Sequence, residues 1–158
     1  MPSLKKKIQK FKSSWKNYIF QSIFASLAVW IVIMALSFQE LVIVAAIGAT
    51  AFIVFAMPKQ ITARARNIIG GYLVGIAAGT IFSLFPQSKF STVIYALAVG
   101  FSILVMVMID VEHPPASGVA LSIAIEGFSF EVVFTVLVSV TLLALIHHFF
   151  KPYLKDLV

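Results

Sequence analysis

Residues 110–118, with the sequence DVEHPPASG, decide the fold of this chain. They place two acids, one histidine and two consecutive prolines inside a sequence that is otherwise almost entirely apolar. Proline has no backbone N–H, and the residue before it is forced towards extended geometry, so Pro114 and Pro115 should interrupt any helix that reaches them. We therefore expect the two acids and the histidine to lie beside a break in the backbone.

The composition places the chain in a membrane. Hydrophobic residues make up 61% of the 158 residues and charged residues only 11%, whereas soluble domains carry about one quarter charged residues. A membrane chain of this length buries its surface by packing its own helices together or by packing against copies of itself, so we expect one domain and a homo-oligomer. Cysteine is absent, which excludes disulfides, thiolate chemistry and sulfur ligands for a metal.

The net charge of +6 is concentrated at the amino terminus. Six of the twelve lysines and arginines lie in the first sixteen residues, between apolar residues at helical spacing. This distribution indicates a segment on the membrane surface rather than a nucleic-acid interface. We interpret residues 1–18 as a basic amphipathic cytoplasmic segment; the alternative is a basic tail that only sets the orientation of the chain.

Five apolar stretches are long enough, or nearly so, to cross a bilayer. They comprise residues 19–38, 41–57, 68–85, 91–109 and 131–150. A further apolar run at residues 119–125 is too short to cross alone. Residues 19–150 would thus form a single transmembrane domain, followed by a short cytoplasmic tail at residues 151–158.

The positive charges determine the number of crossings. Lysines and arginines favour the cytoplasmic side, and they occur in the amino-terminal segment, in the loop at residues 59–66 and in the tail at residues 151–155. After four spans the chain is back on the cytoplasmic side at Asp110. The last span must nevertheless start on the outside, because the tail that follows it is expected in the cytoplasm. Residues 110–126 should therefore cross as well; the alternative is a re-entrant loop with the tail outside.

A broken crossing is geometrically feasible. About eleven helical residues from Ala116 rise roughly 16 Å, and about five or six extended residues before them add up to about 20 Å. Together they match a hydrocarbon core of about 30 Å. We therefore predict an all-α membrane protein with about five full transmembrane helices and one broken or half helix after the His-Pro-Pro motif. Three crossings in each half would make it a 3+3 inverted repeat.

Small residues mark two regions of close contact. Gly71, Gly75 and Gly79 recur every four residues and form a stripe on one helix face, which indicates helix packing either within the protomer or across a dimer. The segment from Ala45 to Ala51, which contains Gly48 and Thr50, is a second small-residue region. It is either a packing face or the wall of a cavity beside the break.

The break is the candidate functional site because non-helical backbone is tolerated in a bilayer only where protein or water satisfies it. A new helix should begin at Pro115, and its free N–H groups near residues 116–118 would form a positive pole that suits an anion. Asp110 and Glu112 favour a cation or a proton instead. His113 can pair with either sign of charge and titrates near neutral pH.

The sequence contains no known catalytic motif, and the spacing of potential ligands indicates no metal site. The main alternative to a transporter is an intramembrane enzyme or metal-binding protein that uses Asp110, Glu112 and His113. His147 and His148 could join Glu112 around a metal, although histidines at the end of a span are ordinary at the membrane interface. A third alternative is a structural or regulatory membrane subunit.

Three ordered blocks of sequence carry a family resemblance. They are residues 113–121 (HPPASGVAL), residues 48–51 (GATA) followed by Pro58, and residues 66–71 (RNIIGG). With these blocks the chain resembles the HPP family of integral membrane proteins from Phe20 onward. The resemblance implies a membrane protein built around these segments, with plant chloroplast and cyanobacterial relatives that are linked to nitrite transport. It also implies that Arg66 and Asn67 belong to the same functional core as His113, with Arg66 as an anion partner or a counter-ion of Asp110.

We expect a multi-pass transporter or channel in the cell inner (plasma) membrane. Its substrate would be a small solute, with a small inorganic anion such as nitrite as the first choice. It would work as a homo-oligomer in the lipid bilayer, without a cofactor, a metal or a nucleic-acid partner. Tyr72, where many relatives have a histidine, and the acidic Glu112 depart from the family pattern. The residues expected to line the site are Asp110, Glu112, His113, Pro114, Pro115, Ser117, Gly118, Gly48, Thr50, Arg66 and Asn67.

Overall fold

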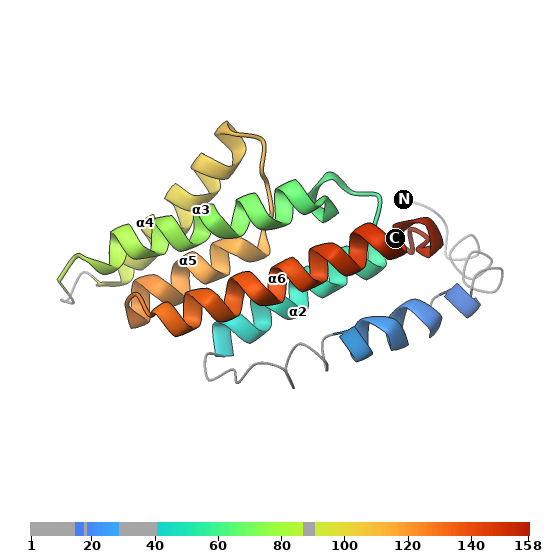
Figure 1. The fold of residues 1–158 in the computed structure, drawn as a ribbon. Helices are drawn as coiled ribbons and strands as arrows, with labels where there is room; N and C mark the ends of the chain where they lie inside the picture. The colour runs from blue at the N-terminus through green and yellow to red at the C-terminus, as the bar shows by residue number, and fades with distance from the viewer. Residues whose placement is uncertain (1–14, 18, 29–40, 87–90) are drawn as a thin grey trace.

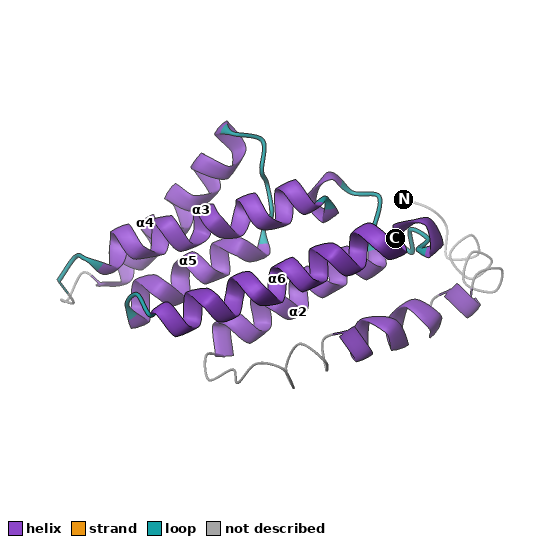
Figure 2. Ribbon diagram, in the orientation of Figure 1, coloured by secondary structure: helices purple, strands orange, loops and turns teal. Residues whose placement is uncertain are grey.

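The computed structural model describes residues 15–17, 19–28, 41–86 and 91–158. Within these ranges the chain is helical and contains no β-strand, as Figure 2 shows. The predicted all-α class is therefore confirmed for this part of the chain. The basic segment expected at residues 1–18 and the span expected at residues 19–38 lie partly outside the described residues.

Residues 15–17 and 19–28 are helical and precede the labelled elements of Figure 1. In chain order these elements are α2 (Leu41–Ala56), η1 (Ile61–Ala63), α3 (Ala65–Ser83), α4 (Ser91–Met108), α5 (Pro115–Glu126), α6 (Phe130–Phe150) and η2 (Lys151–Tyr153). The two η elements are single 3₁₀ turns. The chain is thus a succession of apolar helices joined by short connections.

Several of these helices are suited to a bilayer. Among the described residues, three are long and apolar enough to cross one: Ala65–Ser83, Ser91–Met108 and Phe130–Tyr153. Two shorter apolar helices, Val42–Ala56 and Pro115–Glu126, accompany them. The predicted membrane class therefore agrees with the length and composition of these helices.

Local sequence signals set the ends of the short helix after the break. α5 begins with Pro115 in its first turn, where the backbone N–H that proline lacks would have no acceptor within the helix. It ends at Gly127, whose positive φ of 89° is a conformation that glycine adopts easily. α6 begins after Ser129, whose hydroxyl accepts a hydrogen bond from the Val132 N–H at 3.4 Å. These signals confine α5 to twelve residues.

α5 is the central helix of the bundle. It contacts α2, α3 and α4, and its most extensive contact is with α3. Seven of its twelve residues are buried. Figure 1 shows α5 starting in the middle of the bundle and running towards the end at which α6 begins, after the chain has returned from the tip of α4. The short helix is therefore enclosed by longer ones.

The glycine stripe of α3 is the surface on which the break and α5 pack. A Cβ added at Gly71 would lie 2.6 Å from the His113 Cβ. A Cβ added at Gly75 would meet the Ala116 carbonyl, and Gly79 packs against α5 in the same way. Of the two alternatives left open by the sequence, the stripe therefore makes its contact within the protomer.

α4 ends in a left-handed turn at Asp110. The φ of Asp110 is +56°, the Val111 N–H donates to the Met106 carbonyl at 2.9 Å, and the Asp110 N–H donates to the Val107 carbonyl at 3.4 Å. This pair of hydrogen bonds is a Schellman motif. Aspartate tolerates the left-handed conformation better than most residues, and the Asp110 side chain is exposed. The acid therefore has a structural reason to occupy this position.

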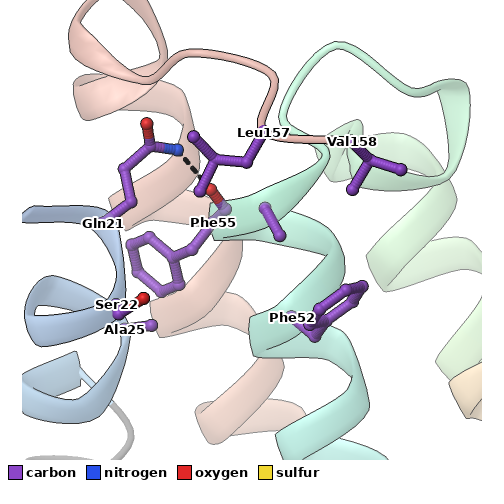
Figure 3. Close-up of a pocket in the computed structure, with 8 residues that line it drawn as sticks. Gln21, Ser22, Ala25, Phe52, Phe55, Leu157 and Val158 are labelled. Carbon is purple, nitrogen blue, oxygen red and sulfur yellow. Dashed lines mark hydrogen bonds between the residues drawn. The ribbon is translucent and has the colours of Figure 1, made fainter. Parts of the chain in front are cut away.

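A buried glutamine joins the amino-terminal helix to the carboxy-terminal tail. The Gln21 amide nitrogen donates to the carbonyls of Phe55 and Lys155, the latter at 2.8 Å, and its amide oxygen accepts from the Lys155 N–H at 3.1 Å. Figure 3 shows Gln21 directed at Phe55 beside Leu157, where the three segments border a cavity of about 280 Å³. The amino-terminal helix, the end of α2 and the tail therefore lie at one end of the bundle.

Replacing Gly75 by alanine tests the packing of α5 on α3. We expect Gly75→Ala to destabilise the protein by about 1–3 kcal/mol, because the added methyl group must displace the backbone of α5. Gly100→Ala in α4 is the matched control, because nothing lies within 4 Å of a Cβ there and alanine is the better helix former by about 1 kcal/mol. Heating both variants in detergent, followed by size-exclusion chromatography, measures the difference. Equal thermal stability would contradict the packing described above.

Substitutions at Asp110 separate its backbone role from its charge. We expect Asp110→Gly and Asp110→Asn to retain wild-type stability, because both residues adopt the left-handed conformation. Asp110→Val should lose about 1–2 kcal/mol, because a β-branched side chain clashes in that conformation. Thermal unfolding in detergent distinguishes the three variants. If Asp110→Asn were as unstable as Asp110→Val, the carboxylate charge rather than the turn would be the important property.

Candidate transport site

His113 is fully buried, and both of its ring nitrogens are hydrogen-bonded. Nδ1 lies 2.8 Å from the Thr62 carbonyl oxygen, and Nε2 lies 2.9 Å from the Thr50 hydroxyl oxygen. A carbonyl can only accept, so Nδ1 carries the hydrogen and the neutral ring presents Nε2 as an acceptor. The break is therefore connected through one side chain to α2 and to the loop before α3.

Thr50 is the centre of this polar cluster. Its hydroxyl lies 2.8 Å from the Tyr72 hydroxyl and 3.0 Å from the Ala46 carbonyl, in addition to its contact with His113. The Thr50 and Tyr72 side chains are completely buried, and the rings of Tyr72 and His113 lie 5.4 Å apart between centroids. Side chains from α2, α3 and the break thus meet in one network within the apolar core.

Arg66 and Asn67 hold the backbone of the break. The Arg66 guanidinium donates to the Ile109 carbonyl at 3.1 Å, and the Asn67 amide donates to the Glu112 carbonyl at 3.3 Å. Arg66 thus places positive charge at the carboxy-terminal end of α4, where the helix dipole favours a cation. Among the described residues, no ion pair joins Arg66 to Asp110.

The amino-terminal turn of α5 differs from the sequence-based expectation. The N–H of Ala116 donates to the His113 carbonyl at 2.9 Å, and the N–H of Ser117 donates to the Pro114 carbonyl at 3.1 Å. The Ser117 hydroxyl also donates to Pro114, at 2.7 Å. The φ and ψ of Pro114 are helical, at −50° and −39°. The carbonyls of His113 and Pro114 are therefore placed to accept hydrogen bonds from the N–H groups of Ala116 and Ser117. The expectation of free N–H groups at Ala116 and Ser117 is therefore wrong.

The small-residue segment of α2 presents two different faces to its surroundings. Thr50 faces the break, and a Cβ at Gly118 of α5 would lie 3.7 Å from the Ala46 Cβ. Gly48 lies on an exposed face, where an added Cβ would meet nothing within 4 Å. The face that carries Ala46 and Thr50 is therefore both a packing face and a wall of the site, and Gly48 is outside it.

A cavity of about 230 Å³ lies against the break. Its lining residues are Ile103, Met106, Val107, Glu112, His113, Pro114 and Ser117. The apolar part of the lining comes from α4, and the polar part comes from the break and the first turn of α5. Glu112 and His113 are the ionisable residues of the lining, and the His113 side chain is fully buried with both ring nitrogens engaged with Thr50 and Thr62.

The histidines near the end of α6 serve a different region. His147 is buried, and its Nε2 lies 3.0 Å from the Pro58 carbonyl, which ties α6 to the loop after α2. His148 is exposed. Among the described residues, no three His, Asp or Glu side chains are grouped as potential metal ligands. The metal arrangement of Glu112 with these two histidines is therefore not formed.

Sequence reasoning missed two members of the site, Tyr72 and the Thr62 carbonyl. Tyr72 was noted only as a departure from the family pattern, although a polar side chain in an apolar span must find a buried partner. Its position next to Gly71, on the helix face that meets the break, was the available signal. The role of Thr62 is carried by its backbone, and no side-chain pattern could have indicated it.

Comparison with known proteins agrees with the sequence blocks and the helical architecture. The family model described as "HPP, transmembrane region" matches residues 10–155, nearly the whole chain. A transmembrane protein of Dictyostelium discoideum is 33% identical over 90 residues, which cover 55% of this chain and 31% of that protein. The chain thus spans about one third of that relative. No solved structure matches the chain. The family match over almost all of the sequence shows that the chain belongs to the HPP family of transmembrane proteins.

Proposed function

We propose that the protein is a multi-pass membrane transporter for a small inorganic anion such as nitrite, with the His113 break as its site. The observation that carries the proposal is the buried polar network of His113, Thr50 and Tyr72 beside a cavity in an otherwise apolar bundle. Polar groups are expensive inside a membrane and commonly mark substrate or ion pathways. Non-helical backbone at membrane depth also favours a site or pore.

The distribution of charge supports a six-crossing arrangement. In the described part of the chain the basic residues belong to the amino-terminal helix, the loop after α2, the start of α3 and the tail: Lys16, Lys59, Arg64, Arg66, Lys151 and Lys155. Figure 1 shows these segments towards the same end of the bundle. By the positive-inside rule this end would face the cytoplasm. The break and α5 would then make the fifth crossing together, because α5 runs towards the opposite end in Figure 1.

The two short helices support an inverted repeat. In each proposed half a short apolar helix, α2 or α5, is followed by a long one, α3 or α6. α2 and α5 contact each other at Ala46 and Gly118. In inverted-repeat transporters the substrate site lies near the midplane, where discontinuous helices of the two halves meet. The same geometry here would place the site between Thr50 and His113.

The choice of nitrite rests on the family resemblance and on size. A cavity of about 230 Å³ has room for a small hydrated ion. Apolar side chains exposed along α4 provide surface for lipid and for a second copy in a homo-oligomer. A small cation is the second candidate substrate, because Glu112 lines the cavity and the N–H groups of Ala116 and Ser117 are already occupied.

Uptake of nitrite into proteoliposomes tests the substrate and the site together. We expect wild type to take up nitrite and His113→Ala to lose at least about tenfold in initial rate, equivalent to about 1.4 kcal/mol. The loss follows because the truncation leaves Thr50 and the Thr62 carbonyl without their partner. His148→Ala, an exposed histidine on α6, is the matched control and should transport at the wild-type rate.

Two results would overturn the proposal at different points. If wild type takes up no nitrite while it moves a small cation, the anion assignment is wrong and the second candidate is correct. If His113→Ala transports nitrite at the wild-type rate, the substrate is right and the site is wrong. Size-exclusion profiles of the purified variants separate a transport defect from misfolding.

A further inference from the structure

We propose that a proton is carried together with the anion, and that His113 Nε2 binds it while the Thr50 hydroxyl changes its acceptor from His113 to the Ala46 carbonyl. This inference rests on the proposed transport function. It starts from the three contacts of one hydroxyl: Ala46 at 3.0 Å, Tyr72 at 2.8 Å and His113 at 2.9 Å. A hydroxyl has one hydrogen and two lone pairs, so it cannot donate to Ala46 and His113 at once.

In the neutral state every member of the network has a partner. His113 Nδ1–H donates to the Thr62 carbonyl. The Thr50 hydroxyl donates to Nε2 and accepts from the Tyr72 hydroxyl. The Ala46 carbonyl keeps its ordinary helical bond within α2. No buried polar side-chain atom among the described residues lacks a partner.

The protonated state satisfies the same atoms without moving any heavy atom. One proton is added at Nε2, and the ring then donates to the Thr50 oxygen at the same 2.9 Å. The Thr50 hydrogen rotates to the Ala46 carbonyl, which lies within reach at 3.0 Å. Tyr72 continues to donate to the second lone pair of Thr50. Threonine commonly bonds the carbonyl four residues before it in a helix, so the rotation uses an ordinary bond.

The ionisable groups near the ring include two acids. Asp110 and Glu112 bring two acids within three residues of His113, and Glu112 lines the same cavity as the ring. The other titratable or charged groups on the surrounding elements are Tyr72 and Arg66 of α3, Lys59 and Arg64 of the loop before it, Tyr95 of α4, Glu126 of α5, and Glu131, His147 and His148 of α6. Arg66 is engaged with Ile109, and His147 with Pro58. α2 carries no titratable residue.

A proton at His113 resolves the conflict of charge within the cavity. An anion would be repelled by Glu112 unless a positive charge is nearby. The imidazolium supplies that charge at the cavity wall, so anion and proton enter together with no net charge. Moving an electroneutral pair avoids the high energy of an isolated charge at membrane depth. The class of cargo would thus be a monovalent anion with one proton.

Nitrogen-15 NMR of histidine-labelled protein in lipid nanodiscs tests the proton site without any substrate. The chain has three histidines, so the single variants His147→Asn and His148→Asn assign the His113 signals. We expect the neutral Nδ1–H form at about pH 8 and conversion to the imidazolium within the range down to about pH 4. A His113 ring that stays neutral throughout this range would overturn the proposal.

Variants of Thr50 test the change of acceptor. Thr50→Val keeps the shape of the side chain but removes the acceptor of the charged ring, so the titration midpoint should fall by about one pH unit or more. Thr50→Ser should titrate as wild type. Thr80→Val is the matched control, because the Thr80 hydroxyl makes the same kind of bond to the Ile76 carbonyl at 2.8 Å in α3. An unchanged midpoint in Thr50→Val would remove Thr50 from the mechanism.

Proteoliposomes with a trapped pH dye test the coupling. We expect nitrite uptake by wild type to acidify the lumen and to accelerate under an inward proton gradient, measured above the background of empty liposomes. Thr50→Val should lose that acceleration, and Thr80→Val should keep it. Nitrite uptake without coupled proton entry would refute the coupling but leave the transport function intact. No nitrite uptake at all would refute the transport function, and the NMR titration would then decide the proton site alone.

Discussion

A buried backbone that leaves its helix must find hydrogen-bond partners within the protein, and this constraint governs the structure around His113, whose side chain is fully buried. Two side chains of α3 bind carbonyls at the break: Arg66 donates to Ile109 and Asn67 donates to Glu112. The His113 side chain in turn donates to the Thr62 carbonyl. The loop is therefore anchored to the start of α3 at several points. The polar residues that the sequence marks as candidates for function therefore have a structural role in these hydrogen bonds.

The constraint can be met only because α3 lets the break approach closely. Gly71 leaves the space that the His113 Cβ occupies, and Gly75 leaves space for the first turn of α5. Once the backbones are this close, Tyr72, the neighbour of Gly71, reaches the Thr50 hydroxyl across the core. The glycines therefore act on the site indirectly: they set the distance between helices, and that distance determines which polar side chains can meet.

Sequence patterns predicted the features that depend on local chemistry. The membrane class, the helical fold, the interruption at Pro114 and Pro115 and the short helix after it follow from hydropathy and from the geometry of proline. The pairing of Thr50 with His113 joins residues 63 positions apart, and it depends on the register of three helices that no local pattern determines. The expectation of free N–H groups at Ala116 was wrong because Pro114 has helical dihedral angles, although a residue before proline usually prefers extended geometry. The Gln21 contacts with the tail span 134 positions and had no sequence signal.

The arrangement of charged residues favours a site whose net charge changes with the protonation of His113 over a site that is permanently positive or permanently negative. A permanently positive site would need a cation at the cavity wall, but Arg66 is exposed and engaged with the end of α4. A permanently negative site would rely on Glu112, which is only half-buried and faces an otherwise apolar lining. His113 is the buried ionisable group of the cavity, and its partners satisfy both of its protonation states. Because an uncompensated buried charge is costly in a membrane, the proposed transport would require the charge of the ring and the charge of the cargo to change together, and this requirement is the physical basis of the proposed coupling to protons.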